Sequence, residues 1–405
     1  MLMSIPRDIT LSAQKYLENS DILLFIGARQ AGKTTILKQL KGILEKEDNP
    51  AYFLNLEDPE YLGLLNQSPK NLFKIVSLDL KKRSFIFIDE VQYLVNPSHF
   101  LKYFYDEYNG KIKLLVSGSS AFYIDKKFTD SLAGRKKIFW VSTLSFREFL
   151  RFKDEAELAK KDFIHLSLSE SEELSIYYRE YMLYGGYPRV VLSQFEEKIE
   201  ALREIAYSYI KKDIYEAHIR QDEVFYKLFK MLAAQIGNLV NSSELASSLG
   251  ISKTAVDNYL YIMRKSFHLH LVKPFFRNMR KELTKMPKVY FSDMGLRNFF
   301  LGDFKNFDQR QDCGQLLENA VYRQLRQRYD EDAIKFWRTI QKNEVDFVVE
   351  DKKAFEVKVN PGKFREKNYK TFFSHYPDIG LSIVSLDIKD KKAIANHTLL
   401  EAWQI

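Results

Sequence analysis

One glycine-containing segment has the residue types and spacing to bind nucleotide phosphates. It fits the pattern of a phosphate-binding loop and comprises Gly27, Ala28, Arg29, Gln30, Ala31, Gly32, Lys33, Thr34 and Thr35. Gly27 and Gly32 allow the backbone to approach phosphate with its N–H groups pointing inward. Lys33 is expected to reach the β- and γ-phosphates, and the Thr34 hydroxyl is expected to bind Mg²⁺. The pattern therefore predicts a site for ATP with Mg²⁺.

Two acidic residues downstream supply the chemistry that such a site needs. Asp89 and Glu90 follow the apolar residues 85–88, which predict a strand buried on both faces of a sheet. Open parallel sheets bind ligands at the carboxyl ends of their strands. We therefore expect Asp89 to hold Mg²⁺ through water. Glu90 is expected to orient or deprotonate the water that attacks the γ-phosphate.

Two further residues are candidates for nucleotide sensing, and each has an alternative role. Ser117 ends a third apolar strand at 113–117. Its hydroxyl is expected either to contact the γ-phosphate or attacking water, or to cap an ordinary strand-to-helix turn. Arg135 precedes the apolar residues 138–141. It is a candidate phosphate-sensing arginine, in its own subunit or toward a neighbouring one, and otherwise a surface arginine.

A second group of residues that could bind a metal ion lies near the end of the sequence. Apolar strands predicted at 345–349 and 354–359 flank a charged turn, which indicates a hairpin. If the turn spans 350–352, Asp346 lies directly opposite Glu356, with their Cβ atoms about 5 Å apart. Two carboxylates this close repel each other unless a cation lies between them. Their oxygen atoms favour Mg²⁺ or Mn²⁺.

Glu318 and Lys358 would complete this group as a site for phosphodiester cleavage. Lys358 shares a strand face with Glu356 and would stabilise charge that develops on the phosphate. Glu318 lies on a predicted helix before the hairpin and would be a further metal ligand. The set resembles the core of PD-(D/E)XK nucleases, although Val345 stands in place of the proline. The alternative is a nuclease-like fold kept for binding.

The order of several sequence motifs resembles that of one protein family, and the resemblance covers nearly the whole chain. The phosphate-binding loop is followed by residues 87–92, 116–120, 132–135 and 144–149. In this order they resemble a family of prokaryotic AAA-type ATPases. Members of that family carry a C-terminal domain of unknown function similar to PD-(D/E)XK nucleases. The resemblance implies an ATPase module.

The elements that position the nucleotide site alternate between strands and helices. Strand patterns at 22–26, 52–58, 85–88 and 113–117 predict an α/β, doubly wound sheet of the P-loop NTPase type. Farther along, a glycine turn separates two short helical patterns within 242–260, which is typical of a helix-turn-helix. Residues of its second helix would be exposed for contacts with DNA: Lys253, Thr254 and Asn258.

Two segments of this middle region each have two possible roles. Residues 267–276 would form the β wing of a winged helix, which either contacts DNA or serves as a spacer or protein-binding surface. The basic segment 277–288 is either a phosphate-binding surface or a solvated loop.

Four domains are therefore predicted. Residues 1–160 form a P-loop AAA-type ATPase domain, and residues 161–240 form a helical lid or linker. Residues 241–298 form a winged helix-turn-helix, and residues 299–405 form an α/β domain like PD-(D/E)XK nucleases.

Charge and composition indicate which kinds of partner the protein binds. The net charge of +8 favours an anionic partner such as DNA. Cys313 is the only cysteine, and no apolar run approaches the length of a membrane span. We expect a cytoplasmic protein with no membrane partner, and a homo-oligomer is a candidate assembly.

Three functions remain open. The first is an ATP-hydrolysing protein that acts on DNA and cleaves phosphodiesters with a divalent metal. The second is a regulatory or signalling ATPase that binds DNA or protein without cleavage. The third is an ATPase that remodels proteins.

Overall fold

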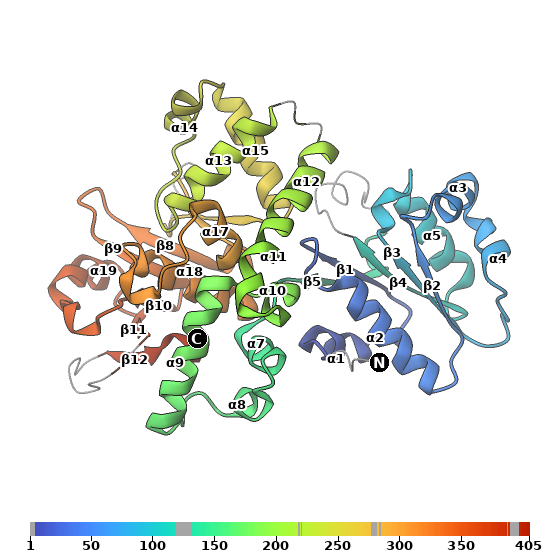
Figure 1. Ribbon diagram of the computed structural model, residues 1–405, viewed down its shortest axis with the longest axis horizontal. Coiled ribbons are helices and arrows are strands. Elements are labelled where there is room, and N and C mark those ends of the chain that lie inside the picture. The colour runs from blue at the N-terminus through green and yellow to red at the C-terminus, as the bar shows by residue number, and fades with distance from the viewer. Residues whose placement is uncertain are drawn as a thin grey trace. The chain divides into compact units, whose positions relative to one another are not determined.

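The computed structural model describes residues 5–118, 132–217, 219, 221–276, 282, 285–386, 388 and 397–405 (Figure 1). The chain divides into two compact units. One comprises Met1–Thr143 with Lys265–Phe267, and the other comprises Leu144–Arg264 with His268–Ile405. Within the described residues, no helix is both long and apolar enough to span a membrane.

The first unit is built on a parallel sheet. In its described part, five strands have the order β2-β3-β4-β1-β5. They are β1 (Ile22–Gly27), β2 (Ala51–Asn55), β3 (Ser84–Asp89), β4 (Ile112–Gly118) and β5 (Lys136–Val141). Each strand runs parallel to its neighbours. The carboxyl ends of the strands therefore share one edge, and the predicted α/β parallel sheet is confirmed.

Helices pack on both faces of this sheet. They are α1 (Asp8–Gln14), α2 (Lys33–Lys46), α3 (Pro59–Gln67), α4 (Leu72–Ile75) and α5 (Pro97–Tyr108), with 3₁₀ turns at Pro69–Asn71 and Val91–Tyr93. Phe25 of β1 shares a core with Leu37 of α2, whereas the adjacent Ile26 shares a core with Phe104 of α5. Adjacent strand residues point to opposite faces. A strand covered on both faces therefore needs the continuous apolar run that the sequence contains.

The second unit begins with a series of helices. They are α7 (Phe146–Phe152), α8 (Ala156–Lys160), α9 (Leu168–Tyr184), α10 (Pro188–Leu192), α11 (Lys198–Glu204), α12 (Ile210–Glu216) and α13 (Asp222–Ala234), with a 3₁₀ turn at Phe195–Glu197 and a π-helical turn at Ile205–Tyr209. The division after Thr143 precedes residue 160, the predicted end of the first domain. Phe146 gives the reason, because its ring lies 4.8 Å from that of Tyr178 on α9. Helix α7 therefore packs in the core of the second unit.

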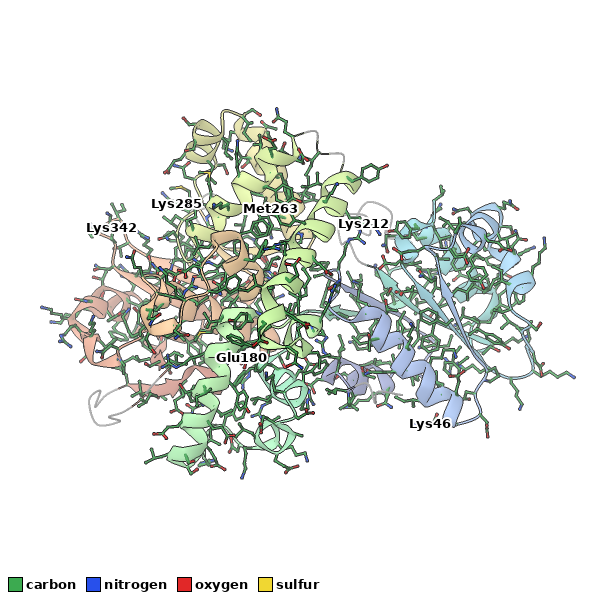
Figure 2. The ribbon with its side chains drawn as sticks, viewed as in Figure 1. Lys46, Glu180, Lys212, Met263, Lys285 and Lys342 are labelled. Carbon is green, nitrogen blue, oxygen red and sulfur yellow. The ribbon has the colours of Figure 1, made fainter. Side chains whose placement is uncertain are left out.

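A helix pair and a two-stranded ribbon follow. Helix α14 (Ser242–Leu249) ends at Gly250, whose φ of 67° is left-handed, and α15 (Lys253–Lys265) begins three residues later. Strand β6 (Leu269–Val272) pairs antiparallel with β7 (Lys288–Phe291), and α17 (Met294–Leu301) comes next. Met263 of α15 is fully buried in the apolar core of this region (Figure 2).

A second sheet lies in the C-terminal part of this unit. Its strands are β8 (Ile334–Arg338), β9 (Glu344–Val349), β10 (Lys353–Val357), β11 (Gly380–Ser385) and β12 (Thr398–Glu401), in the order β12-β11-β10-β9-β8. Strands β9 and β10 are antiparallel, with Val349 opposite Lys353. The predicted hairpin with a turn at 350–352 is therefore confirmed. Continued by one pair, this register places Asp346 opposite Glu356.

Helices also cover the two faces of this second sheet. They are α18 (Cys313–Arg328) and α19 (Lys370–His375), with 3₁₀ turns at Phe307–Gln309, Glu331–Ala333, Pro361–Lys363, Glu366–Tyr369 and Ala402–Gln404. Phe347 of β9 shares a core with Val321 of α18. The adjacent Val348 shares a different core with Phe372 of α19. Helix α18 thus brings Glu318 to the sheet that carries the two strand acids.

Candidate functional site

The phosphate-binding loop connects the end of β1 to the start of α2. Gly27 ends the strand, and Lys33, Thr34 and Thr35 open the helix. The residues between them are Ala28, Arg29, Gln30, Ala31 and Gly32. Gly32 has a φ of 100°, a left-handed conformation that glycine adopts without strain. A Cβ atom at Gly27 would lie 1.9 Å from the carbonyl oxygen of Val141, so the neighbouring strand already requires glycine there.

Lys33 is held inside this loop by backbone carbonyl groups. Its buried ammonium group donates to the carbonyl of Gly27 at 3.0 Å and to that of Ala28 at 2.8 Å. These carbonyls are neutral acceptors, and an ammonium group binds phosphate oxygens as a point charge. The loop therefore presents a cation that can exchange its carbonyl partners for phosphate.

Three polar side chains converge at the edge where β3 and β4 end. The Thr34 hydroxyl donates to Asp89 Oδ2 at 2.6 Å. The Ser117 hydroxyl donates to Asp89 Oδ1. The hydroxyl and the carboxylate are hard oxygen donors of the kind that Mg²⁺ prefers. Thr34 and Asp89 thus fit a nucleotide-bound Mg²⁺, and Ser117 orients the carboxylate.

Glu90 follows Asp89 in a left-handed conformation, with a φ of 60°. This conformation is uncommon for a residue with a side chain and costs free energy. The Glu90 N–H group donates to Ser117 Oγ at 3.2 Å, and the Gln92 side-chain amide donates to the Glu90 carboxylate. Gln92 is a positioning residue that the sequence analysis did not identify, although it stands in the same motif.

Arg7 is a second residue that motif reasoning missed. Its buried guanidinium group donates to the carbonyl of Ala31 at 2.7 Å and to that of Ser142 at 3.0 Å. The first of these carbonyls belongs to the phosphate-binding loop, and the second follows β5. Arg7 therefore links the loop to the chain beyond the sheet. A single arginine before a short helix carries no sequence signal for this contact.

Arg135 does not lie near the loop, which corrects its assignment as a phosphate sensor within the same subunit. Its carbonyl accepts the N–H of Ile22, at the opposite end of β1 from Gly27. The length of the strand, roughly 17 Å at 3.3 Å per residue, separates the two ends, and an arginine side chain cannot span it. The guanidinium group instead binds Asp106 at 3.0 Å. A role toward a neighbouring subunit stays a prediction.

The C-terminal hairpin brings Asp346 and Glu356 together as buried neighbours. Asp346 Oδ2 accepts the N–H of Val357 at 2.8 Å, and the Lys358 ammonium group binds the Glu356 carboxylate. Burial, and after it the nearby Asp346 carboxylate, raises the pKa of Glu356 to about 8. The pKa of Lys358 is also raised: burial lowers it, and the Glu356 and Asp346 carboxylates more than offset that effect.

Glu318 lies within this cluster but is bound to groups from β7. Its Oε1 atom accepts the Tyr290 hydroxyl at 2.6 Å and the Lys288 ammonium group at 3.0 Å. Lys288 also lies 2.5 Å from Glu344 Oε1 and 3.8 Å from Asp346 Oδ1. Burial raises the pKa of Glu318 to about 7. Lys288, Tyr290 and Glu344 were not identified from the sequence.

A divalent metal does not fit the acids as they are arranged. Lys288 is 1% exposed, and its ammonium group lies among three of the carboxylates. In the described parts of the chain, no group of three or more histidine, cysteine, aspartate or glutamate side chains is placed to hold a metal ion. Two members of the expected metal set, Glu318 and Asp346, therefore face an amino group, and the third, Glu356, binds Lys358.

The second helix of the helix pair presents polar residues to solvent. Lys253, Thr254 and Asn258 are exposed, and Lys253 pairs with Asp257 at 2.6 Å. The basic segment 277–288 is different. Arg277, Arg280 and Lys281 lie outside the described residues. Lys285 is exposed (Figure 2). Lys288 is buried, so it cannot contribute to an exposed phosphate-binding surface.

Comparison with protein families separates the chain into three matched regions. Residues 19–150 match a family described as an AAA domain. Most of this match lies in the first unit, which is therefore similar to P-loop ATPases of the AAA type. Residues 176–306 and 313–402 match two families described as domains of unknown function. The resemblance of the last region to PD-(D/E)XK nucleases finds no support in its family match.

Several proteins are similar over most of the chain. An uncharacterised protein of Methanocaldococcus jannaschii is 29% identical over 396 residues, which cover 95% of this chain and 84% of that protein. An uncharacterised protein of Haemophilus influenzae is 25% identical over 366 residues, which cover 86% and 85%. The AAA-type domain and the two further regions therefore occur together in other proteins.

Solved structures of low similarity include two replication proteins. The ORC2 protein of Aeropyrum pernix in its ADP form has a TM-score of 0.38 and 14% identity, covering 74% of this chain and 92% of that one. DnaA of Aquifex aeolicus bound to AMPPCP has a TM-score of 0.29 and 14% identity, covering 64% and 86%. These TM-scores are too low to carry a conclusion about function.

Proposed function

We propose that the protein binds and hydrolyses ATP and uses this cycle to act on DNA. The observation that carries the first part is the convergence of Lys33, Thr34, Asp89 and Glu90 at one edge of the parallel sheet. Lys33 and Thr34 open α2, whereas Asp89 and Glu90 stand at the end of β3. A structural turn would not require the Thr34 hydroxyl and the Asp89 carboxylate to meet. The match of residues 19–150 to an AAA domain supports the same function.

Each residue of this edge has a separate role in the proposed reaction. Lys33 exchanges the carbonyl groups of Gly27 and Ala28 for phosphate oxygens. Thr34 and Asp89 hold Mg²⁺, which neutralises charge on the phosphates when it is bound. Glu90, positioned by Gln92, accepts a proton from the attacking water.

DNA is proposed as the partner of the second unit through a winged helix formed by α14, α15 and the β6–β7 ribbon. The exposed Lys253, Thr254 and Asn258 are side chains that contact phosphates and base edges. The ion pair between Lys253 and Asp257 is exposed, and such pairs contribute only about 0–1 kcal/mol. A DNA phosphate can therefore replace Asp257 at little cost.

The acidic cluster favours action on DNA without cleavage over metal-dependent cleavage. Cleavage by this site would require a divalent ion shared by Glu318, Asp346 and Glu356. The ammonium group of Lys288 lies against two of these acids. We therefore propose the binding role for this region, and DNA cutting with Mg²⁺ or Mn²⁺ that is lost in Glu356→Ala would contradict it.

Steady-state ATP hydrolysis with and without duplex DNA tests the proposal. The wild type is expected to hydrolyse ATP, to bind DNA and to change its turnover when DNA is present. Lys253→Ala with Asn258→Ala is expected to weaken DNA binding and to leave DNA-free turnover intact. Lys367→Ala removes an exposed lysine elsewhere in the second unit and is the charge-matched control. Turnover that is indifferent to DNA, without DNA binding, would instead favour a protein partner.

A further inference from the structure

A buried lysine inside the acidic cluster comes from a different region of the chain. Lys288 begins β7, within the matched region 176–306, whereas the acids belong to the matched region 313–402. Tyr290 shares a strand face with Lys288 and binds the same acid, Glu318. The cluster is therefore assembled by two regions that are recognised as separate families.

Geometry makes the Lys288 ammonium group the centre of this cluster. It lies 3.0 Å from Glu318 Oε1, 2.5 Å from Glu344 Oε1 and 3.8 Å from Asp346 Oδ1. An ammonium group has three N–H donors, so three carboxylates can satisfy it. Its nitrogen also lies over the ring of Phe336, 5.4 Å from the ring centre.

The lysine and the acids stabilise each other, because either would be unfavourable to bury without the other. A buried charge without partners is strongly disfavoured. Carboxylates that lie close together repel one another unless a cation is between them. The carboxylates raise the pKa of Lys288 well above its ordinary value even though burial lowers it. The amino group therefore remains a cation.

We propose that Lys288 is the resident cation of this cluster and takes the role that the sequence pattern predicts for a divalent metal. The wild-type cluster then binds neither Mg²⁺ nor Mn²⁺, and it acts as an ion-paired joint between the regions 176–306 and 313–402. A Mg²⁺ ion bound by these acids would need to lie about 2.0–2.1 Å from carboxylate oxygens. The Lys288 nitrogen already occupies the space among Glu318, Glu344 and Asp346.

The remaining charges of the cluster leave little attraction for a second cation. Arg338 binds Glu344 at 2.9 Å, and Lys358 binds Glu356. Together with Lys288, these groups place three basic side chains against four carboxylates. A single proton balances the difference. A divalent ion would instead leave the buried cluster with excess positive charge.

The test is Mn²⁺ binding to the nucleotide-free protein, measured by electron paramagnetic resonance. The wild type is expected to show no Mn²⁺ site that Asp346→Asn removes. Lys288→Met preserves the apolar stem and removes the charge, so it is expected to gain one site. That site is expected to disappear in the double variant with Asp346→Asn. Lys285→Met removes a nearby exposed lysine and is the matched control, with no gain.

Two results would overturn this proposal. One is a Mn²⁺ site in the wild type that Asp346→Asn removes, and this measurement decides even if Lys288→Met folds poorly. The other is a folded Lys288→Met variant that gains no site. Thermal unfolding gives an independent readout, because Mn²⁺ is expected to raise the Tm of Lys288→Met and not that of the wild type. An equal rise in both would also contradict the proposal.

Discussion

Lys33 and Lys288 are both buried lysines, but their partners differ. Lys33 donates to two backbone carbonyl groups of its own loop. Lys288 is surrounded by three carboxylates from another region of the chain. A neutral carbonyl holds an ammonium group less strongly than a carboxylate does. The first lysine is therefore available to an incoming anion, whereas the second is committed to the fold.

This difference separates a binding site from a structural joint that contains similar residue types. Acids at the carboxyl ends of parallel strands face a loop that can accept phosphate. Acids on the C-terminal hairpin face a cation supplied by the protein itself. The following changes would break or sharpen this contrast.

Lys33→Ala is expected to have the largest effect, with loss of both ATP binding and turnover. The Lys33 ammonium group donates to the carbonyls of Gly27 and Ala28 and is the cation that this loop offers to phosphate. Binding of a fluorescent ATP analogue and phosphate release measure the two losses. The unfolding temperature is expected to stay near that of the wild type, because the lysine's hydrogen bonds to Gly27 and Ala28 are to neutral backbone groups. Normal turnover in this variant would remove the basis of the nucleotide site.

Glu90→Gln is expected to preserve ATP binding and to lower turnover by about 10²–10⁴-fold, the usual contribution of a general base. The amide cannot accept the proton of the attacking water, although it retains the shape of the side chain. Analogue binding and single-turnover hydrolysis separate the two steps. Gln92→Ala should lower turnover less, because Gln92 acts through Glu90. Wild-type turnover in Glu90→Gln would mean that another group activates the water.

Lys288→Met is expected to lower the free energy of unfolding by about 3–5 kcal/mol, because it leaves buried carboxylates without their cation. Urea unfolding of the full chain measures this change. Lys285→Met should match the wild type, because its side chain is exposed. A Lys288→Met variant as stable as the wild type would show that the cluster does not need the ammonium group.

Stability is expected to fall as the pH rises toward about 8. The pKa of Glu356 is raised from 4.5 to about 8 by burial and by Asp346. Between these values the folded state holds a proton that the unfolded state has released, so folding is favoured at the acidic end. Urea unfolding across this range measures the slope, and Glu356→Gln should flatten it. An unchanged slope in Glu356→Gln would assign the dependence to another group.

Arg135→Ala is expected to have the smallest effect and to leave the turnover of the dilute protein unchanged. Its guanidinium group binds Asp106 at the end of the sheet opposite the loop. Turnover measured over a range of protein concentrations tests whether Arg135 acts on a neighbouring subunit. A loss of turnover that appears only at high concentration would support action on a neighbouring subunit. A loss at every concentration would contradict the placement of Arg135.

The sequence predicts contacts well where the residues are close in the chain or where topology fixes them. The loop from Gly27 to Thr35 is contiguous, so its form follows from local chemistry. Asp89 and Ser117 end parallel strands, and parallel strands end at a common edge. Asp346 and Glu356 were paired by counting from a three-residue turn.

Other contacts depend on information that the sequence does not display. Arg135 stands before an apolar strand, and a strand pattern alone does not reveal which of its ends lies at the nucleotide edge. Lys288 belongs to a run of basic residues that looks like a solvated surface. Its burial arises from the pairing of β7 with β6 and from the approach of α18, and neither contact has a local signature.

The joint at Lys288 also limits how these proteins can be recombined. Exchange of residues 313–402 with those of a relative would replace Glu318, Glu344 and Asp346. Lys288 would remain, because it belongs to the region 176–306. A chimaera would fold well only if both halves retained complementary charges. The two regions, although they match separate families, are therefore expected to be inherited together, and a substitution at Lys288 should be accompanied by changes among its acids.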